Sequence, residues 1–176
     1  MIREALACDA AAIAGIQVAS WRDTYRGIID DDFLRQLSVT RATSSWLGWF
    51  FERDSLYFCR VATDDAGRVI GYAMGGPSRR ESPLLAELQV LYLHPQAKRQ
   101  GHGAALMRSM ARGFDLRGLH ALEIWSLEAN PSRPFYDRLG GTVDGRRETI
   151  VGGQRLREVR YAWPRLATLI GPRIGA

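Results

Sequence analysis

The segment from Leu85 to Gly113 constrains the fold of this chain more than any other part of the sequence. An apolar run from Leu85 to Leu93, ended by His94-Pro95, predicts a long strand. Gly103 to Gly113 then predicts a helix, because apolar side chains there recur on one helical face. These side chains belong to Leu106, Met107, Met110, Ala111 and Phe114. A strand, a short turn and an amphipathic helix in this order are typical of a mixed α/β sheet covered by helices.

Strands and helices separated by turn signals are predicted along the rest of the chain. Strands are predicted at residues 2–4, 56–63, 68–75, 120–127, 142–150 and 154–163. Helices are predicted at residues 9–20, 31–37, 41–52 and 133–139, with Asp9 as a cap, and residues 21–28 are expected to form a loop. Asp64-Asp65-Ala66-Gly67 and Gly152-Gly153 indicate hairpin turns. The centre of the chain therefore has the order β-α-β-α-β.

The composition is that of a globular chain with a hydrophobic core. Of 176 residues, 46% are hydrophobic and 24% are charged, which fits one domain covering residues 1–176. No run approaches the ~20 apolar residues needed to cross a bilayer, and the N-terminus lacks the order of a secretory signal. Cys8 and Cys59 form no metal-ligand spacing, which indicates two buried thiols in a reducing compartment. We therefore expect a cytoplasmic protein without a membrane partner.

The net positive charge of the chain comes almost entirely from arginine. The formal net charge is +5, and Lys98 is the only lysine. This excess fits either an anionic ligand, because arginine suits phosphate recognition, or a basic solvated surface. Basic residues form no run typical of a nucleic-acid-binding tail, so no nucleic-acid partner is expected. His94, His102 and His120 share no spacing that indicates a metal site or a catalytic triad, so no metal is expected.

The turn that follows the strand at 85–93 is the strongest candidate for a binding site. It reads Lys98-Arg99-Gln100-Gly101-His102-Gly103-Ala104. Backbone N–H groups at a helix N-terminus bind anions, and glycines let such a backbone approach phosphate oxygens closely. The motif is neither a dinucleotide fingerprint, because Leu106 replaces the third glycine, nor a P-loop, because no Gly-Lys-Ser/Thr follows. Taken alone, it fits a phosphate site or a simple tight turn.

Two motifs together indicate a family. Glu87-Leu88-Gln89-Val90-Leu91-Tyr92-Leu93-His94-Pro95 with the following turn resembles the acetyl-CoA motif of the GNAT superfamily of N-acetyltransferases. Asn130-Pro131-Ser132-Arg133-Pro134-Phe135-Tyr136-Asp137-Arg138-Leu139-Gly140-Gly141 resembles its second signature. Ser20-Trp21-Arg22-Asp23-Thr24-Tyr25-Arg26-Gly27 resembles the PaiA-like branch. The resemblance implies a mostly antiparallel mixed sheet of about seven strands flanked by helices and splayed between the fourth and fifth strands.

The resemblance also implies how acetyl-CoA would bind. The diphosphate would lie on residues 98–104, and the pantetheine arm would pair with backbone groups of Leu91 and Leu93. A backbone N–H near Leu91 or Tyr92 would polarise the thioester carbonyl. Asn130 would hold the pantetheine, fix the local loop or cap a helix. This chain departs from the family pattern at Lys98, where Gln or Arg is usual, and at Arg99, where glycine is common.

Candidate catalytic and substrate-binding residues complete the expected site. Tyr136 corresponds to the general acid of the family, although a packing or cofactor-anchoring role also fits this position. Glu87 is the first candidate for the base that removes the proton of the amine, because it begins the strand leading into the thioester site. Glu123 and Glu128 are alternative bases. Trp21 and Tyr25 fall where the substrate-covering loop of the family lies, so they would hold a cationic amine or pack against the sheet.

These expectations predict an acetyl-CoA-dependent N-acetyltransferase that acetylates a primary amine of a small molecule, such as a polyamine, by direct attack in a ternary complex. The alternative acceptors are a protein N-terminus and an aminoacyl group. A non-catalytic acyl-CoA-binding regulatory module is a further alternative. The family resemblance allows a homodimer without requiring one.

Overall fold

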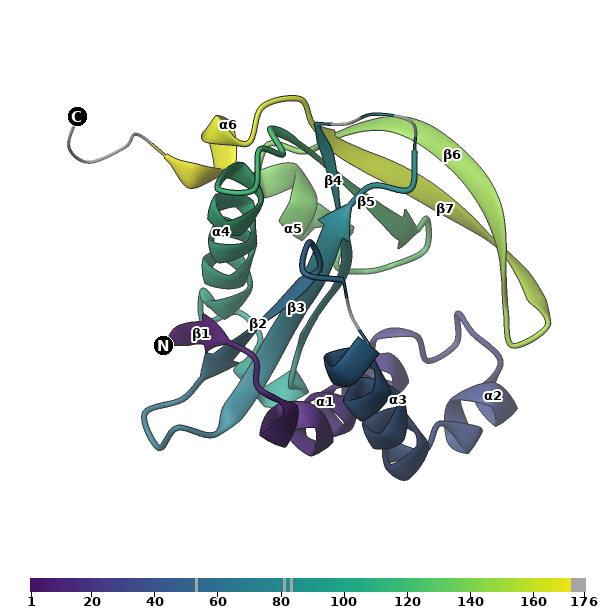
Figure 1. Cartoon of the computed structure of the whole chain (residues 1–176). Helices are drawn as coiled ribbons and strands as arrows, with labels where there is room; N and C mark the ends of the chain where they lie inside the picture. The colour runs from purple at the N-terminus through teal and green to yellow at the C-terminus, as the bar shows by residue number, and fades with distance from the viewer. Residues whose placement is uncertain (53, 81, 83, 172–176) are drawn as a thin grey trace.

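The computed structural model describes residues 1–52, 54–80, 82 and 84–171 of the chain (Figure 1). It has the predicted mixed α/β architecture, with one seven-stranded sheet. The strands are β1 (Ile2–Glu4), β2 (Phe58–Thr63), β3 (Val69–Pro77), β4 (Leu85–Leu93), β5 (Ala121–Leu127), β6 (Thr142–Val151) and β7 (Gln154–Trp163). The helices are α1 (Ala10–Thr24), α2 (Asp31–Gln36), α3 (Val39–Glu52), α4 (His102–Asp115), α5 (Arg133–Arg138) and α6 (Ala167–Ile170).

The sheet has one parallel strand pair, and this pair is short. The strand order is β1-β2-β3-β4-β5-β7-β6, and every neighbouring pair except β4–β5 is antiparallel. The parallel pair joins Leu85–Glu87 of β4 to Ala121–Glu123 of β5. Beyond Glu87 and Glu123 the described strands are no longer paired with each other, although they continue to Leu93 and Leu127. The predicted splay between the fourth and fifth strands is therefore present.

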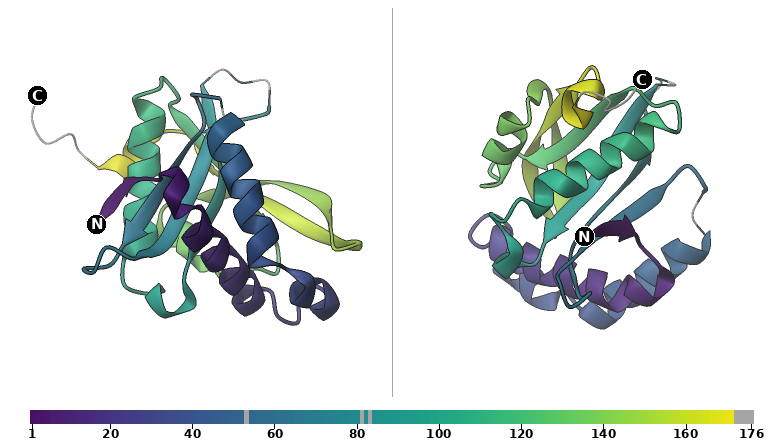
Figure 2. Two further views of the ribbon diagram at one scale, coloured as in Figure 1. Left: turned by 60° about the horizontal axis from the view of Figure 1, so that its bottom comes forward. Right: turned by 90° about the vertical axis from the view of Figure 1, so that its left-hand side faces the viewer.

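Helices cover both faces of the sheet, as Figure 2 shows. On one face α4 packs on residues that include Phe58, Leu88 and Leu122, and this is the larger core. Its five predicted apolar positions, residues 106, 107, 110, 111 and 114, are all fully buried. On the other face α1 and α3 pack on β2 and β3, with Ile13 and Trp46 against Tyr72. The helical periodicity of residues 103–114 thus correctly predicted the core face of α4.

Helix α1 is longer than the sequence pattern predicted. Residues 21–28 were expected to form a loop, but α1 continues through Thr24 and Tyr25 donates its N–H to the carbonyl of Trp21. No glycine or proline occurs from Trp21 to Arg26, and the next residue, Gly27, has a φ of +73°. The rings of Trp21 and Tyr25 also pack edge to face, with centroids 5.2 Å apart. The expected loop is therefore reduced to the short segment after Tyr25.

Other sequence predictions need smaller corrections. Cys59 is buried in β2 as expected, but Cys8 is exposed because it lies in a short 3₁₀ turn at the surface. The Asp9 carboxylate does not cap α1; it accepts hydrogen bonds from Arg3 and from the N–H of Leu6. The short helix α6 and the 3₁₀ turn at Pro95–Ala97 were not predicted.

The β6–β7 hairpin reaches across to the connection between α1 and α2, as Figure 1 shows. At its tip, the Gln154 side chain accepts a hydrogen bond from the N–H of Asp30 (3.1 Å) and donates one to the carbonyl of Ile28 (3.3 Å). Gly152 lies so close to the Phe33 ring that a Cβ would come within 2.6 Å of it. Two segments far apart in the sequence are thereby joined beside the splayed strands.

The packing of α4 generates a stability prediction that reverses the usual effect of Gly→Ala in a helix. A Cβ on Gly113 would lie 2.5 Å from the Phe58 ring, whose position is fixed by the nearby Phe114 ring and the Arg117 guanidinium. Overpacking of about 1–3 kcal/mol should exceed the helix-propensity gain of up to about 1 kcal/mol. Gly113→Ala is therefore expected to lower the free energy of unfolding measured by urea denaturation.

Gly15 and Gly48 provide matched controls for this variant. Both lie inside α-helices, and a Cβ at either position would meet no atom within 4 Å. Gly15→Ala and Gly48→Ala should therefore raise the free energy of unfolding by up to about 1 kcal/mol. Equal stabilisation by all three substitutions would contradict the close packing at Gly113.

Candidate active site

A cleft with a volume of about 970 Å³ passes through the sheet where β4 and β5 separate. Its walls include Leu88 to Leu93 of β4 and Ile124 to Leu127 of β5, and its ends are formed by the last turn of α1, the loop before α4 and the start of α5. Because the two strands diverge here, backbone groups of their facing edges point into the cleft instead of toward each other. A ligand of extended shape can therefore pair with strand backbone inside the fold.

The cleft has two chemically different sides, set by the alternation of side chains along each strand. Ile124 of β5 and Tyr161 of β7 point toward α4 and belong to the larger core. Residues of the opposite parity on these strands, such as Trp125 and Glu158, point to the other face, where Leu127 packs against Tyr25, the residue that follows α1. We call these the α4 side and the α1 side of the cleft.

The predicted phosphate-binding turn forms one end of the cleft. Arg99 and Gly101 both have left-handed backbone, with φ of +64° and +84°, and Arg99 is the one described non-glycine residue with positive φ. Left-handed residues in a turn direct successive N–H groups toward one point, which makes an anion-binding concavity. Gly101 precedes the first turn of α4 without a side-chain cap, so the first N–H groups of the helix remain available. The conformation of Arg99 also explains why glycine suits this position.

Gly103 fixes how closely the turn packs on α5. A Cβ on Gly103 would approach the Phe135 ring to 3.3 Å, and Gly103 and Ala104 both line the cleft. The neighbouring Gln100 donates its side-chain N–H to the carbonyl of Gln96, which closes the turn on itself. His102, also predicted to contact the cofactor, is the first residue of α4 and is not among the residues that line the cleft.

Lys98 links the turn to α1. Its Nζ donates to the Asp23 carboxylate (2.7 Å) and to the Thr24 hydroxyl (3.1 Å). All three residues line the cleft. The sequence suggested that Lys98 contacts a phosphate directly, whereas here its ammonium joins two ends of the cleft. The direct phosphate contact remains a prediction.

The backbone of β4 presents alternate residues to the cleft. The N–H of His94 donates to the carbonyl of Ile70 on β3, so His94 and Tyr92 direct their backbone groups toward β3. Leu91 and Leu93 therefore direct theirs toward the cleft. One of these groups is engaged, because the carbonyl of Leu93 accepts a hydrogen bond from the Ser20 hydroxyl (3.1 Å). Of the two predicted thioester contacts, Leu91 and Tyr92, the Leu91 N–H has the required direction.

Tyr136 lies on α5 and lines the cleft from the α4 side. It packs against the rings of Phe135 and Tyr161, and only 8% of it is exposed. Burial raises the pKa of its phenol well above the usual value, and the nearby Tyr25 and Tyr161 raise it further. The phenol is therefore protonated at neutral pH in the wall of the cleft, and its acid role remains a prediction.

Two further tyrosines and an asparagine converge on the same part of the cleft. The pKa values of Tyr25 and Tyr92 are both raised, first of all by burial, and the two side chains interact with each other. Asn130 donates from Nδ2 to the hydroxyl of Tyr25 (3.4 Å) and to that of Ser126 (3.2 Å). Its Oδ1 accepts from the N–H of Ser132 (2.8 Å). Of the roles predicted for Asn130, the contacts in the structure are those of a residue that fixes the loop.

Trp21 lines the cleft from α1 and is held by packing. Its ring lies against those of Tyr25 and Phe33, with centroid distances of 5.2 and 6.3 Å. Its buried Nε1 makes no hydrogen bond within the described part of the chain. Trp21 therefore packs on neighbouring rings, as one prediction had it, and it also lines the cleft, while its contact with an amine remains a prediction.

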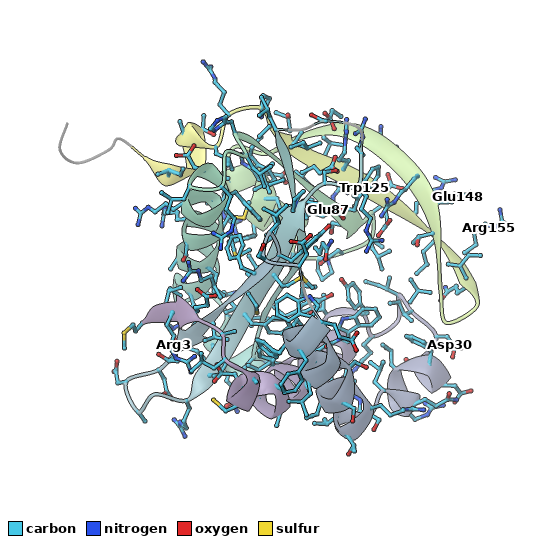
Figure 3. All side chains as sticks on the ribbon, viewed as in Figure 1. Arg3, Asp30, Glu87, Trp125, Glu148 and Arg155 are labelled. Carbon is cyan, nitrogen blue, oxygen red and sulfur yellow. The ribbon has the colours of Figure 1, made fainter. Side chains whose placement is uncertain are left out.

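Glu87, the predicted base, directly precedes Leu88, the first β4 residue that lines the cleft, and is itself not among the lining residues. It is half-buried on β4, directly across from Glu123 of β5, at the last residue pair before the strands separate (Figure 3). Burial and the charge of Glu123 raise the pKa of Glu87, and Arg79 and Arg147 oppose that shift.

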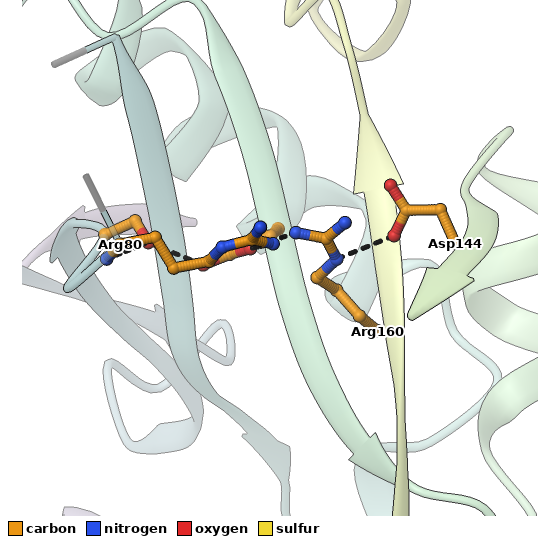
Figure 4. Close-up of polar contacts among 5 residues, drawn as sticks. Arg80, Asp144 and Arg160 are labelled. Carbon is orange, nitrogen blue, oxygen red and sulfur yellow. Dashed lines mark hydrogen bonds and ion pairs between the residues drawn. The ribbon is translucent and has the colours of Figure 1, made fainter. Parts of the chain in front are cut away.

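Glu123, an alternative base, is 1% exposed and fully engaged in an ion-pair network. Arg80 and Arg160 approach its carboxylate from two sides, and Asp144 binds Arg160, as Figure 4 shows. The Ser78 hydroxyl also donates to it. Glu128, the other alternative, lies next to Arg146 and outside the residues that line the cleft.

Sequence reasoning missed Glu158, an acidic side chain that lines the cleft on the α1 side. It lies on β7 opposite Leu127 of β5, and its carboxylate accepts a hydrogen bond from Arg147 Nε (2.6 Å). The alternation in Glu158-Val159-Arg160-Tyr161 could have indicated this residue. In a strand it places Glu158 and Arg160 on one face and the apolar Val159 and Tyr161 on the other. Within the described residues, no group of three or more His, Cys, Asp or Glu side chains could hold a metal ion.

Comparisons with known proteins identify relatives of this chain. The model of the acetyltransferase (GNAT) family matches residues 19–141. The uncharacterized N-acetyltransferase YuaI of Bacillus subtilis is 35% identical over 169 residues, which are 96% of this chain and 95% of that protein.

Solved structures with the same fold include enzymes with a bound cofactor. PaiA N-acetyltransferase from Thermoplasma acidophilum, in complex with coenzyme A, has a TM-score of 0.71 and 20% identity, and the match covers 90% of this chain and 96% of that one. The yncA protein of Salmonella typhimurium, solved with acetyl-CoA, has a TM-score of 0.69 and 21% identity, covering 100% and 96%. At these identities the likeness concerns the fold, and it confirms the predicted fold class.

The burial of Tyr136 generates a prediction about its titration. Because its pKa is raised well above the usual ~10, this phenol should stay protonated at pH values where exposed tyrosines ionise. We expect the ultraviolet absorbance of tyrosinate, recorded as the protein minus its Tyr136→Phe variant, to show no step near pH 10. A full step at that pH would mean that the phenol is solvated and would contradict the burial of Tyr136.

Proposed function

The chain belongs to the acetyltransferase (GNAT) family, and on this premise we propose that it transfers an acetyl group from acetyl-CoA to a primary amine of a small molecule. The observation that carries the proposal is the cleft between β4 and β5, which has an N–H-rich turn at one end and a buried, protonated tyrosine in its wall. Residues on both sides of the separated strands line this one cleft, which supports our proposal of direct attack in a ternary complex.

In this proposal the turn at residues 98–104 binds the diphosphate of acetyl-CoA. The left-handed backbone at Arg99 and Gly101 and the uncapped first turn of α4 supply N–H donors, and the α4 dipole favours negative charge there. A Cβ on Gly101 would meet no protein atom within 4 Å, so the space beside this residue is open to a ligand. The ion pair between Lys98 and Asp23 links the turn to α1 and so restricts the distance between them.

The edge of β4 then receives the pantetheine arm. Leu91 directs its N–H into the cleft, where it can donate to the thioester carbonyl and stabilise the negative charge that develops on that oxygen. A single donor of this kind contributes about 3–4 kcal/mol to lowering the barrier. Acetyl-CoA supplies an acetyl group activated as a thioester, and the chain supplies its orientation and the donors around it.

Tyr136 is the proposed general acid. Its phenol is protonated at neutral pH, so it can donate a hydrogen bond to the departing sulfur and then its proton as the C–S bond breaks. Burial makes this phenol a weaker acid than a free tyrosine, so the transfer depends on the negative charge that develops on the sulfur. Tyr136 lies on the α4 side of the cleft, the side of the turn that would bind the diphosphate. Asn130 supports this region by connecting Tyr25 to the loop that begins α5.

A small acceptor is favoured by the closed border of the α1 side. There the β6–β7 hairpin is hydrogen-bonded to the α1–α2 connection through Gln154, beside the aromatic residues Trp21 and Tyr25. This leaves the acceptor a bounded space with aromatic walls, which suits a small cation better than an extended peptide.

None of the helices in the described part of the chain has the length and apolar composition that a membrane span requires.

The function is tested by incubating the protein with acetyl-CoA and a panel of small primary amines and polyamines, and measuring the free thiol of released coenzyme A. Peptides with a free N-terminus form a second panel. Thiol release with a small amine supports the proposal, whereas acetylation of peptides alone would favour a protein acceptor. Tight acetyl-CoA binding in calorimetry without turnover on either panel would favour a regulatory module.

The diphosphate turn generates a binding prediction with a matched control. Gly101→Ala places a side chain on a residue with φ of +84°, which costs about 1–2 kcal/mol and distorts the N–H cradle. We expect the Kd of acetyl-CoA, measured by calorimetry, to rise about tenfold. Gly118→Ala carries the same strain at φ +77°, outside the cleft, and should lower stability without changing the Kd. Equal Kd values for the two variants would contradict this assignment of the turn.

Tyr136→Phe is predicted to lower kcat about 100-fold while leaving the Kd of acetyl-CoA nearly unchanged, because only the proton donor is removed. Tyr57→Phe removes a hydroxyl that donates to the Pro77 carbonyl outside the cleft, and it should keep the original kcat. Steady-state kinetics with the best amine from the panel measures both variants. An unchanged kcat for Tyr136→Phe would exclude the acid role.

A further inference from the structure

We propose that Glu158 is the group that binds the ammonium of the acceptor and removes its proton, so that the acceptor is a primary alkylamine presented from the α1 side of the cleft. This inference rests on the proposed acetyl transfer and identifies the acceptor end of the same site.

The position of Glu158 meets the first requirement, which is access to the cleft at the point where the strands separate. β7 pairs with β5 throughout this region, and Glu158 is the partner of Leu127 at the end of β5. The adjacent Val159 and the next core residue, Tyr161, point to the α4 side, so Glu158 points to the α1 side. It lines the cleft, and 16% of its side chain is exposed.

The carboxylate of Glu158 is oriented but not saturated. Arg147 on β6 donates from Nε to Oε2 at 2.6 Å, and no hydrogen bond or ion pair from the described residues reaches Oε1. The Arg147 guanidinium also lies 4.0 Å from the centroid of the Trp125 ring, which restricts its movement. An oriented carboxylate with one open oxygen can accept a hydrogen bond from an ammonium and then its proton.

Aromatic side chains surround the same part of the cleft. Trp21 lies on α1, Tyr25 directly follows α1 and Trp125 lies on β5, and all three line the cleft together with Glu158. Tyr25 lies near enough to Glu158 for that charge to contribute to its raised pKa. Aromatic faces attract an ammonium, and the carboxylate adds a directional acceptor, so the combination suits a primary alkylamine better than a neutral or anionic acceptor.

Glu87 is less well placed for this role. It is the last residue of β4 that pairs with β5, opposite Glu123, and it does not line the cleft. The charged and titratable groups around Glu158 are Arg147 on β6, Tyr25 directly after α1 and Glu87 on β4. Of these carboxylates, Glu158 is the one that lines the cleft beside the aromatic side chains.

The proton balance of the reaction is complete with the residues named. One N–H proton of the ammonium passes to the Glu158 carboxylate, and the freed nitrogen lone pair forms the C–N bond to the thioester carbonyl carbon. The C–S bond then breaks with its electron pair on sulfur, and Tyr136 donates its phenolic proton to that thiolate. The nitrogen loses its second proton, which restores the Tyr136 phenol through solvent, and Glu158 releases its own proton to solvent. The net products are an amide, a thiol and one proton.

The test compares Glu158→Gln with the unaltered protein over a range of pH, using acetyl-CoA and the best primary alkylamine. At pH 7 an alkylamine with a pKa of about 10.4 is almost entirely protonated, so loss of the proton acceptor should lower kcat/KM for the amine about 100-fold. The neutral fraction of the amine rises tenfold with each pH unit, so the defect should shrink as the pH approaches 10. The Kd of acetyl-CoA should stay unchanged.

Two further variants make the result decisive. Glu148→Gln removes a carboxylate of the same hairpin that is paired with Arg155 and lies outside the cleft, and it should leave kcat/KM unchanged (Figure 3). Glu158→Asp keeps the carboxylate and should recover part of the lost activity at pH 7, which a purely structural role would not produce.

The possible failures are distinguishable. Unchanged kcat/KM for Glu158→Gln at pH 7, or a defect that stays constant with pH, overturns this inference and leaves the proposed function standing. If the unaltered protein binds no acetyl-CoA or acetylates no amine, the proposed function fails and this inference fails with it.

Discussion

The separation of β4 from β5 is the constraint on which the rest of the site depends. These strands share only the pairs from Leu85 to Glu87 with Ala121 to Glu123, and both continue well beyond them. Strand edges that lose their partner leave backbone N–H and C=O groups that cost free energy unless something else satisfies them. The Ser20 hydroxyl satisfies the Leu93 carbonyl, and the remaining groups face the cleft. The loss of pairing between β4 and β5 therefore also creates the binding surface.

The last turn of α1 holds this separation open. Ser20 reaches β4 through the Leu93 carbonyl, Asp23 reaches the diphosphate turn through Lys98, and Tyr25 receives a hydrogen bond from Asn130 after β5. One helical turn thus contacts three walls of the cleft and sets the distances between them. These contacts explain why α1 extends to Thr24, because a flexible loop at 21–28 would position none of these groups.

The sequence predicted the parts of the structure that depend on local pattern. The apolar face of α4, the strand at 85–93 and the glycine turn are readable because periodicity and glycine are local properties. The contacts of α1 and the role suggested for Glu158 were not readable. The role of Glu158 depends on β7 lying between β5 and β6, an order that chain succession does not give. The contacts of α1 join it to segments more than 70 residues away in the chain. Glu87 was favoured by its position along a strand. The point where β4 and β5 separate depends on how the two strands pair, which the sequence pattern of one strand does not reveal.

The two sides of the cleft give the proposed reaction a spatial order. The attacking nitrogen and the departing sulfur both interact with one carbonyl carbon, yet one must lose protons and the other must gain one. Tyr136 on the α4 side is a phenol that burial keeps protonated, while Glu158 on the α1 side is a carboxylate oriented by Arg147. Tyr136 packs on the α4 side from α5, whereas strand alternation places Glu158 on the α1 side, so the acid and the base can act on one carbonyl carbon from different sides. The splayed sheet therefore separates the two proton transfers that acetyl transfer requires.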